Sequence, residues 1–134
     1  EIERSLHREL FPKFNVPRPE KMSPVCHDYT HFLIDQATNH SFEIAISALL
    51  PCFWVYHENG MHIREKLLQP NPYQIWIDTY AGQEYTEYVK RYVHIIDYIL
   101  RKSCPSVRQK MFKAFRTSTL FELQFFDESL SARR

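Results

Sequence analysis

A cysteine directly follows a proline inside a stretch that otherwise predicts one long helix, from residue 41 to residue 68. The stretch at residues 49–56 reads LLPCFWVY, and its thiol belongs to Cys52. On a wheel of about 100° per residue, four side chains lie within about 60° of it: Leu49, Tyr56, Ile63 and Leu67. Cys52 therefore belongs to the apolar face. A thiol there is either a nucleophile beside a cavity or a small side chain that only packs.

The proline bears on that choice. Pro51 has no backbone N–H, so the carbonyl of Ser47 loses its helical partner and the helix bends. Such a bend costs roughly 3 kcal/mol in a helix interior. Local unwinding beside a cavity would explain why it persists, and so would a helix that wraps around a core.

A glutamate projects from the apolar face of the last predicted helix. Within about 60° of Glu122 on the wheel lie Met111, Phe115, Ser118 and Phe125. Removal from water raises the pKa of a carboxyl group and makes it a usable general acid or base near neutral pH. A buried glutamate satisfied by tyrosine or backbone donors is the alternative.

Three other sequence patterns could suggest a metal, phosphate or nucleic-acid site, but each fits a solvent-exposed surface without such a ligand. Glu58, His62 and Glu65 have spacing suited to a metal, but on the same wheel they lie away from the apolar face of Cys52, so a solvent-exposed face is predicted and no metal site. Gly60 and Gly82 stand alone and form no phosphate loop. The basic residues of the last helix fit an amphipathic surface, and the net charge is only +1. We expect no nucleic-acid partner.

The elements that carry these groups are all helical. The 134 residues contain only two glycines, and helix start signals such as Ser23-Pro24 and Asn71-Pro72 are frequent. Six helices are predicted, at about 2–14, 24–38, 41–68, 73–80, 84–102 and 103–130. The length fits a single domain, 1–134, of all-α class.

Two features that the sequence lacks, a membrane span and a disulfide framework, indicate the cellular location. No apolar run approaches the roughly 20 residues of a membrane span, so no membrane partner is expected. The three cysteines, Cys26, Cys52 and Cys104, are too few and too far apart for a disulfide framework. A cytoplasmic location is expected.

Three motifs in order resemble the TenA/thiaminase II family: LLPCFWVY, then NPYQIWIDTYAGQEY at 71–85, and FRTSTLFELQFFDES at 115–129. The resemblance covers about residues 20–130 and implies the heme-oxygenase-like all-α bundle. It implies a hydrolase that converts aminomethylpyrimidine to hydroxymethylpyrimidine and cleaves thiamin, without a cofactor and as a homo-oligomer, usually a tetramer.

The same resemblance assigns roles to residues. Cys52 matches the nucleophile that adds as a thiolate to the pyrimidine ring, and Glu122 matches the acid and base. Four further residues match the pocket that holds the pyrimidine: Tyr29 in HDYTHFL, Tyr56, Tyr80 and Phe125.

Departures from the family pattern leave other interpretations open. Family members are usually longer, and the N-terminal half supplies an aspartate that has no counterpart in residues 1–22, so only the C-terminal portion of the bundle is expected. Phe126 stands where a tryptophan is common. The alternatives are a non-catalytic binding or scaffold protein on this fold, and a metal-dependent oxidative relative.

Overall fold

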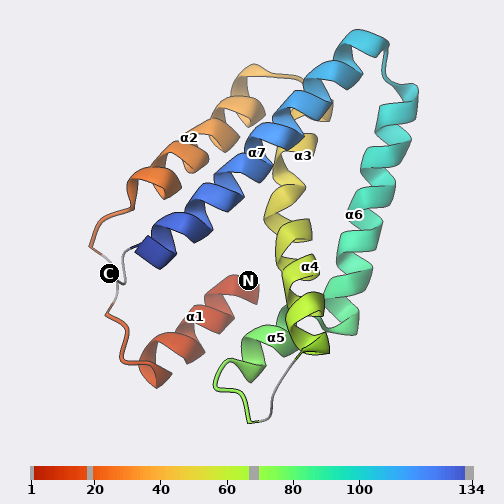
Figure 1. Ribbon diagram of the computed structural model, residues 1–134. Coiled ribbons are helices and arrows are strands. Elements are labelled where there is room, and N and C mark those ends of the chain that lie inside the picture. Colours follow the sequence, from red (N-terminus) through yellow and green to blue (C-terminus); the bar gives the residue numbers. More distant parts are fainter. Residues whose placement is uncertain (1, 18–19, 67–69, 132–134) are drawn as a thin grey trace.

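The computed structural model describes residues 2–17, 20–66 and 70–131, and within these ranges every regular element is a helix (Figure 1). There are seven: α1 (Ile2–Lys13), α2 (Pro24–Asn39), α3 (Phe42–Leu49), α4 (Pro51–Glu65), α5 (Gln74–Tyr80), α6 (Gln83–Lys102) and α7 (Pro105–Ser131). The all-α prediction is confirmed. In the described part of the chain, no helix is both long and apolar enough to cross a membrane.

Two of the predicted helix starts coincide with local hydrogen bonds. Ser23 caps α2, where its side chain accepts from the backbone N–H of Cys26 at 3.3 Å, and Pro24 occupies the first turn. Before α5, the Asn71 side chain accepts from the N–H of Tyr73 at 2.8 Å. α1 ends one residue before the predicted Phe14, and Asn15 turns the chain with φ at 51°.

The prediction of one helix at 41–68 is wrong, because α3 ends at Leu49 and α4 begins at Pro51. Proline donates no hydrogen bond to the preceding turn, so the ladder is interrupted there. The shared apolar face was also wrong in part, since Leu49 is 38% exposed and Ile63 is 40% exposed. Leu49 is the last residue of α3, and Ile63 lies near the far end of α4. Leu67 lies outside the described residues.

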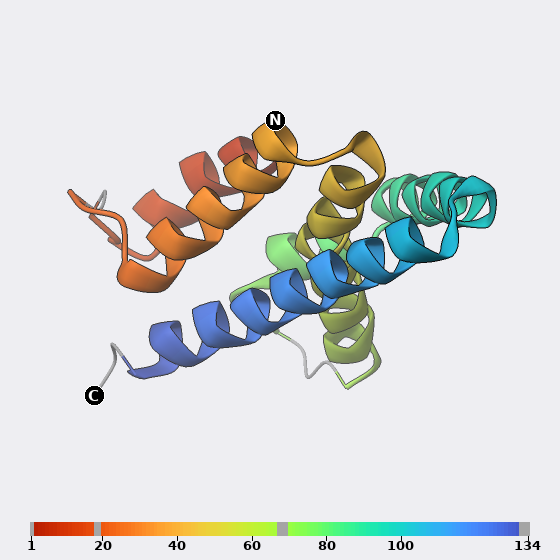
Figure 2. The ribbon, with the colours of Figure 1, turned by 90° about the horizontal axis from the view of Figure 1, so that it is seen from above.

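The helices are arranged around α7, which crosses α3 in the most extensive helix contact of the structure. Figures 1 and 2 show α2 along one side of α7 and α6 on the other side of α3 and α4. α5 packs against α4 near its C-terminal end. Residues from α2, α4 and α7 therefore meet inside the bundle.

Two hydrophobic clusters form the core, one on either side of Pro51. The first joins α3 to α7 through Ile44, Ala48, Met111 and Ala114. The second is built on Leu6, Tyr80, Tyr85 and Val89, with Phe53 and Tyr56 of α4 packed against it. The break between α3 and α4 thus redirects the chain from the first cluster into the second, and Cys52 lies directly after the break.

Candidate active site

Three side chains from three helices meet at the start of α4. The hydroxyl of Tyr29, on α2, lies 3.0 Å from the Cys52 sulfur and donates to Oε1 of Glu122, on α7, at 2.9 Å. A tyrosine hydroxyl has one hydrogen, and here it points to the carboxylate. The Cys52 S–H is then the donor to the tyrosine oxygen. The result is a continuous hydrogen-bonded row from thiol to phenol to carboxylate.

Burial controls the protonation of this row. Glu122 is only 4% exposed, and removal from water raises the pKa of its carboxyl group, against the opposing effect of the hydrogen bond from Tyr29. Burial likewise raises the pKa of the Cys52 thiol to about 11, although its hydrogen bond with Tyr29 works the other way. The resting thiol is therefore protonated near neutral pH, and a nucleophilic sulfur requires that a neighbouring base take its proton.

Tyr29 is fixed from the side as well as at its hydroxyl. Its ring stacks on Phe121 of α7 with centroids 5.2 Å apart, and burial raises the pKa of its phenol. It therefore stays a neutral hydroxyl, able to donate and accept at once. Phe121 was not singled out from the sequence, because its contact with Tyr29 joins residues far apart in the chain.

The other predicted pocket residues lie around Tyr56, one turn after Cys52 on α4. The ring of Tyr56 lies 5.1 Å from that of Tyr80 and 5.7 Å from that of Phe126. Tyr80 is buried in the second core cluster, and burial raises the pKa of its phenol to about 12. Phe125 follows Glu122 by three residues and meets Phe126 edge to face. Of the six predicted site residues, Tyr29, Cys52 and Glu122 are therefore in direct contact with one another. Tyr56 and Tyr80 contact each other. Phe125 lies one turn from Glu122 on α7.

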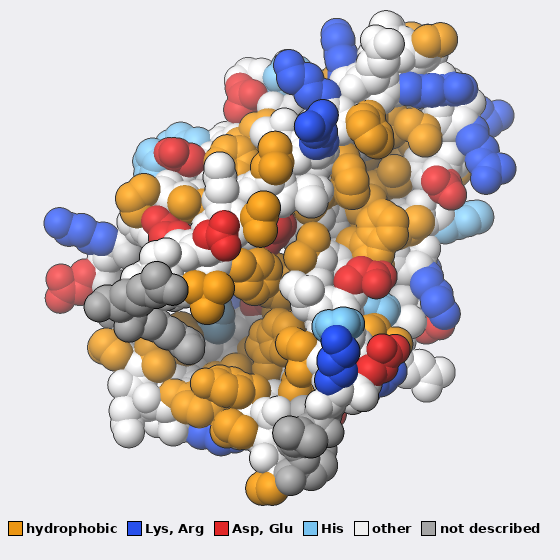
Figure 3. Space-filling view, viewed as in Figure 1, with side chains coloured by type: hydrophobic (Ala, Val, Ile, Leu, Met, Phe, Trp, Pro, Cys, Tyr) orange, Lys and Arg blue, Asp and Glu red, His pale blue; other side chains and the backbone are white. Residues whose placement is uncertain are grey.

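An apolar groove of about 650 Å³ lies beyond Tyr56, where α1, α4, α5 and α7 meet. Its lining includes Leu10, Phe14, Ile63, Tyr73, Trp76 and Phe126. Figure 3 shows hydrophobic side chains gathered where α1, α5 and the end of α7 come together. Trp76 and Phe126 both line the groove and contact the Tyr56 ring, so the groove adjoins the side of Tyr56. Sequence patterns did not identify it.

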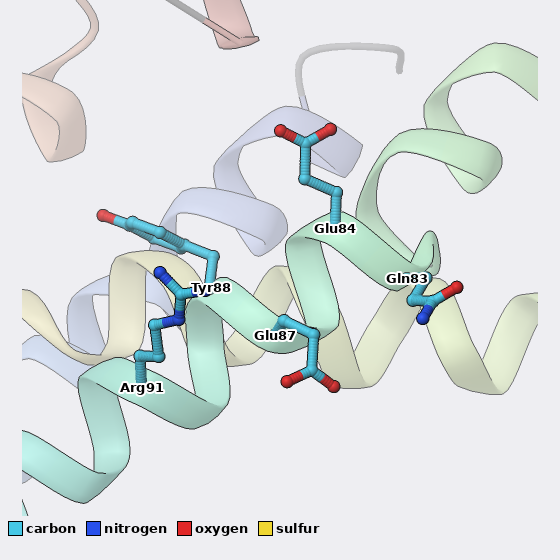
Figure 4. Close-up of a pocket in the computed structure, with 5 residues that line it drawn as sticks. All are labelled: Gln83, Glu84, Glu87, Tyr88 and Arg91. Carbon is cyan, nitrogen blue, oxygen red and sulfur yellow. The ribbon is translucent and has the colours of Figure 1, made fainter.

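A second depression, on α6, lacks convergent groups (Figure 4). All five side chains in the figure come from this one helix, and Glu84 and Glu87 point in different directions. Glu87 is also engaged by Lys90 at 3.1 Å. This surface carries no evident chemistry.

The predicted exposed face of α4 is confirmed, since Glu58, His62 and Glu65 all face solvent. Glu58 accepts from the indole N–H of Trp54 at 2.9 Å. Among the residues that the structure describes, no group of three His, Cys, Asp or Glu side chains is placed to hold a metal ion.

Fold and site together define a helical-bundle protein with a buried cysteine–tyrosine–glutamate centre. The model of the TENA/THI-4/PQQC family matches residues 1–132, and the chain belongs to this family. The fold implied by the three motifs is confirmed by a crystal structure of a TenA homologue from Pyrococcus furiosus, to which the chain is similar with a TM-score of 0.88 and 26% identity over 93% of its length.

Relatives of known name are longer than this chain. It is 34% identical to the aminopyrimidine aminohydrolase of Bacillus subtilis, over 94% of this chain and 55% of that protein. It is 28% identical to the thiamine biosynthesis multifunctional protein ThiED of Corynebacterium glutamicum, over 96% of this chain and 16% of that protein. The chain covers 61% of the Pyrococcus structure. It thus spans about half the length of the Bacillus relative.

Proposed function

We propose that this chain carries the catalytic centre of an aminopyrimidine hydrolase of thiamin salvage, which converts aminomethylpyrimidine to hydroxymethylpyrimidine and ammonia. The observation that carries the proposal is the row in which Tyr29 joins the Cys52 thiol to the Glu122 carboxylate. The similarity to an aminopyrimidine aminohydrolase and to a thiamine biosynthesis protein supports this choice of substrate.

The row supplies both the nucleophile, which is the Cys52 sulfur, and the base that removes its proton, which is Glu122. Glu122 takes the thiol proton through the Tyr29 hydroxyl, and the sulfur adds to an electron-poor carbon of the pyrimidine ring. The protonated Glu122 returns a proton to the departing amine, so that ammonia leaves from the methylene carbon. Water, deprotonated by Glu122, then adds to that carbon. The ring expels the sulfur, which recovers the proton.

Aromatic side chains are suited to hold a flat ring beside this row. Tyr56 and Phe125 lie one turn from the thiol and the carboxylate respectively, and aromatic faces stack on heterocycles while excluding water. We place the pyrimidine between these walls, with Tyr80 supporting Tyr56 from behind.

The groove beyond Tyr56 suits the part of a substrate that lies outside the pyrimidine. Its apolar lining fits a bulky aromatic leaving group, such as the second ring of thiamin. Cleavage of thiamin itself therefore belongs to the proposal alongside the smaller amine.

The domain portion, the oligomeric state and the cellular location are proposed on the family resemblance. On the family resemblance, we propose that these residues form the C-terminal portion of a family domain and that an aspartate outside them contacts the pyrimidine edge; the chain spans 55% of the Bacillus relative. A homotetramer and a cytoplasmic location complete the proposal. The three cysteines are free thiols, as a reducing compartment requires.

The test uses the full-length protein that contains this chain. Purified enzyme should convert aminomethylpyrimidine to hydroxymethylpyrimidine, and Cys52→Ala should remove nearly all turnover. The control is Cys104→Ala, because Cys104 is exposed at the start of α7 and far from the row. Undiminished turnover in Cys52→Ala would exclude the nucleophile role, and inactivity of the wild type would favour a non-catalytic protein on this fold.

A further inference from the structure

The break between α3 and α4 leaves backbone carbonyls that need donors. The last four carbonyls of a helix have no partner within it, and Pro51 has no N–H to offer the turn before it. The last four carbonyls of α3 belong to residues 46–49, which lie in the interior apart from Leu49. Buried carbonyls without donors are costly, so side chains from neighbouring helices are expected to supply them.

Two hydroxyl groups donate to the carbonyls on either side of that of Ser47, the carbonyl that Pro51 leaves without its helical donor. Ser118 of α7 donates to the carbonyl of Ala48 at 2.5 Å, and Tyr92 of α6 donates to the carbonyl of Ile46 at 3.1 Å. Ser118 and Ala48 are both 0% exposed. This serine makes a long-range bond to the backbone at the break, whereas its neighbour Thr119 only bonds within its own helix, to Phe115.

The position of Ser118 relates it to the reacting groups. Ser118 precedes Glu122 by four residues on the same face of α7, and Ala48 precedes Cys52 by four residues across the break. The bond from Ser118 to Ala48 therefore joins α7 to the broken helix one turn before the carboxylate and one turn before the thiol. The Cys52–Tyr29–Glu122 row joins the same two segments at the next turn.

We propose that Ser118 is a positioning residue, which sets the separation of the Cys52 sulfur from the Glu122 carboxylate by holding the Ala48 carbonyl against α7. The role in turnover rests on the proposed hydrolase function, while the role in geometry does not. Tyr92 bonds to the same broken helix from α6, which carries neither Tyr29 nor Glu122, and serves as the matched control.

The experiment measures the pH dependence of Cys52 alkylation by iodoacetamide in full-length protein carrying Cys26→Ser and Cys104→Ser. In Ser118→Ala the alkylation rate at fixed pH should change on the order of threefold to tenfold, since the sulfur moves relative to Tyr29 and Glu122. Tyr92→Phe should leave that rate within twofold of the parent. In turnover, Ser118→Ala should lower kcat on the order of tenfold with KM changed less than about threefold.

Two results would overturn the proposal: a parent-like alkylation profile in Ser118→Ala, or the same change in Tyr92→Phe, which would indicate general loosening. If Ser118→Ala does not fold, the isosteric pair Ser118→Thr and Ser118→Val decides, because only the threonine keeps the hydroxyl. Equal alkylation profiles in that pair would count against the proposal. If the parent lacks hydrolase activity, the proposed function fails while the alkylation results still test Ser118.

Discussion

Tyr29 and Glu122 lie 93 residues apart in the chain, and their side chains are joined by a 2.9 Å hydrogen bond in the interior of the bundle. The same hydroxyl contacts Cys52. One phenol therefore links the proposed nucleophile to the proposed acid and base, and its removal leaves the Cys52 thiol and the Glu122 carboxyl without that partner.

Tyr29→Phe should lower kcat on the order of tenfold to a hundredfold, because the thiol proton loses its path to the carboxylate. The unfolding free energy should fall by about 1 kcal/mol, the usual net value of one hydrogen bond. Steady-state kinetics and urea denaturation measure the two effects. Tyr98→Phe, on an exposed tyrosine of α6, is the control and should change neither. Wild-type kcat in Tyr29→Phe would show that protons pass without the phenol.

Glu122→Gln should raise stability increasingly as the pH rises. Burial raises the pKa of Glu122 above its ordinary value of 4.5, so the folded protein holds this proton more tightly than the unfolded chain does. The stability contributed by the protonated carboxyl is complete below about pH 4.5 and is lost as the pH rises through the raised pKa. Glutamine has no such proton to lose.

Urea denaturation of both proteins at about pH 4 and about pH 8 measures this difference. The gain in unfolding free energy from Glu122→Gln should be larger at the higher pH, while hydrolase turnover is lost at both. A gain that is equal at the two pH values would contradict the raised pKa. The Cys52 thiol, whose pKa is about 11, also lowers the unfolding free energy as the pH rises, but only above about pH 9.

Pro51→Ala should impair chemistry without impairing the fold. Alanine restores an N–H at the break, so α3 and α4 can join into one helix and the start of α4 shifts relative to α7. We expect turnover to fall on the order of tenfold or more. The melting temperature should change little, because Pro51 stands at the first position of α4, where its missing N–H costs little. Circular dichroism and kinetics test this. A fall in melting temperature with unchanged turnover would contradict it.

Pro24→Ala is the matched control for the loss of a proline. Pro24 occupies the first turn of α2, where its missing N–H costs nothing. Turnover should remain that of the wild type.

Tyr73→Ala should separate the substrates. Tyr73 stacks on Phe14 in the wall of the groove, with ring centroids 4.8 Å apart, and it makes no contact with the Cys52–Tyr29–Glu122 row. The value of kcat/KM should fall about tenfold for thiamin, whose second ring would use the groove, and less than about twofold for aminomethylpyrimidine. Equal losses for the two substrates would show that the groove does not bind the leaving group.

Periodicity and capping residues predicted most of the fold, because both are local. The starts of α2 and α5 followed from capping residues, and the burial of Glu122 on α7 followed from spacing. Pro51 predicted a bend, but the wheel drawn over residues 41–68 wrongly placed Leu49 and Ile63 on the buried face.

Contacts between distant segments had no such signal. Tyr29 was selected through the family resemblance, since nothing in the pattern of α2 indicates a partner on α7. The bond from Ser118 to Ala48 spans 70 residues and ends on a backbone carbonyl, which no side-chain pattern reveals. The groove depends on how α1 lies against α5, and so its lining residues were not predicted.

The two clusters on either side of Pro51 divide the molecule into parts that can change separately. α2, α3 and α7 hold the phenol and the carboxylate through one cluster, while α1 and α5 surround Tyr56 through the other, and α6 contributes side chains to both. Substitutions around the groove can therefore accumulate during evolution without disturbing the proton path. Within such a family, leaving-group preference would diverge faster than reaction chemistry, and a directed-evolution library confined to α1 and α5 should yield new substrate ranges from an intact catalytic centre.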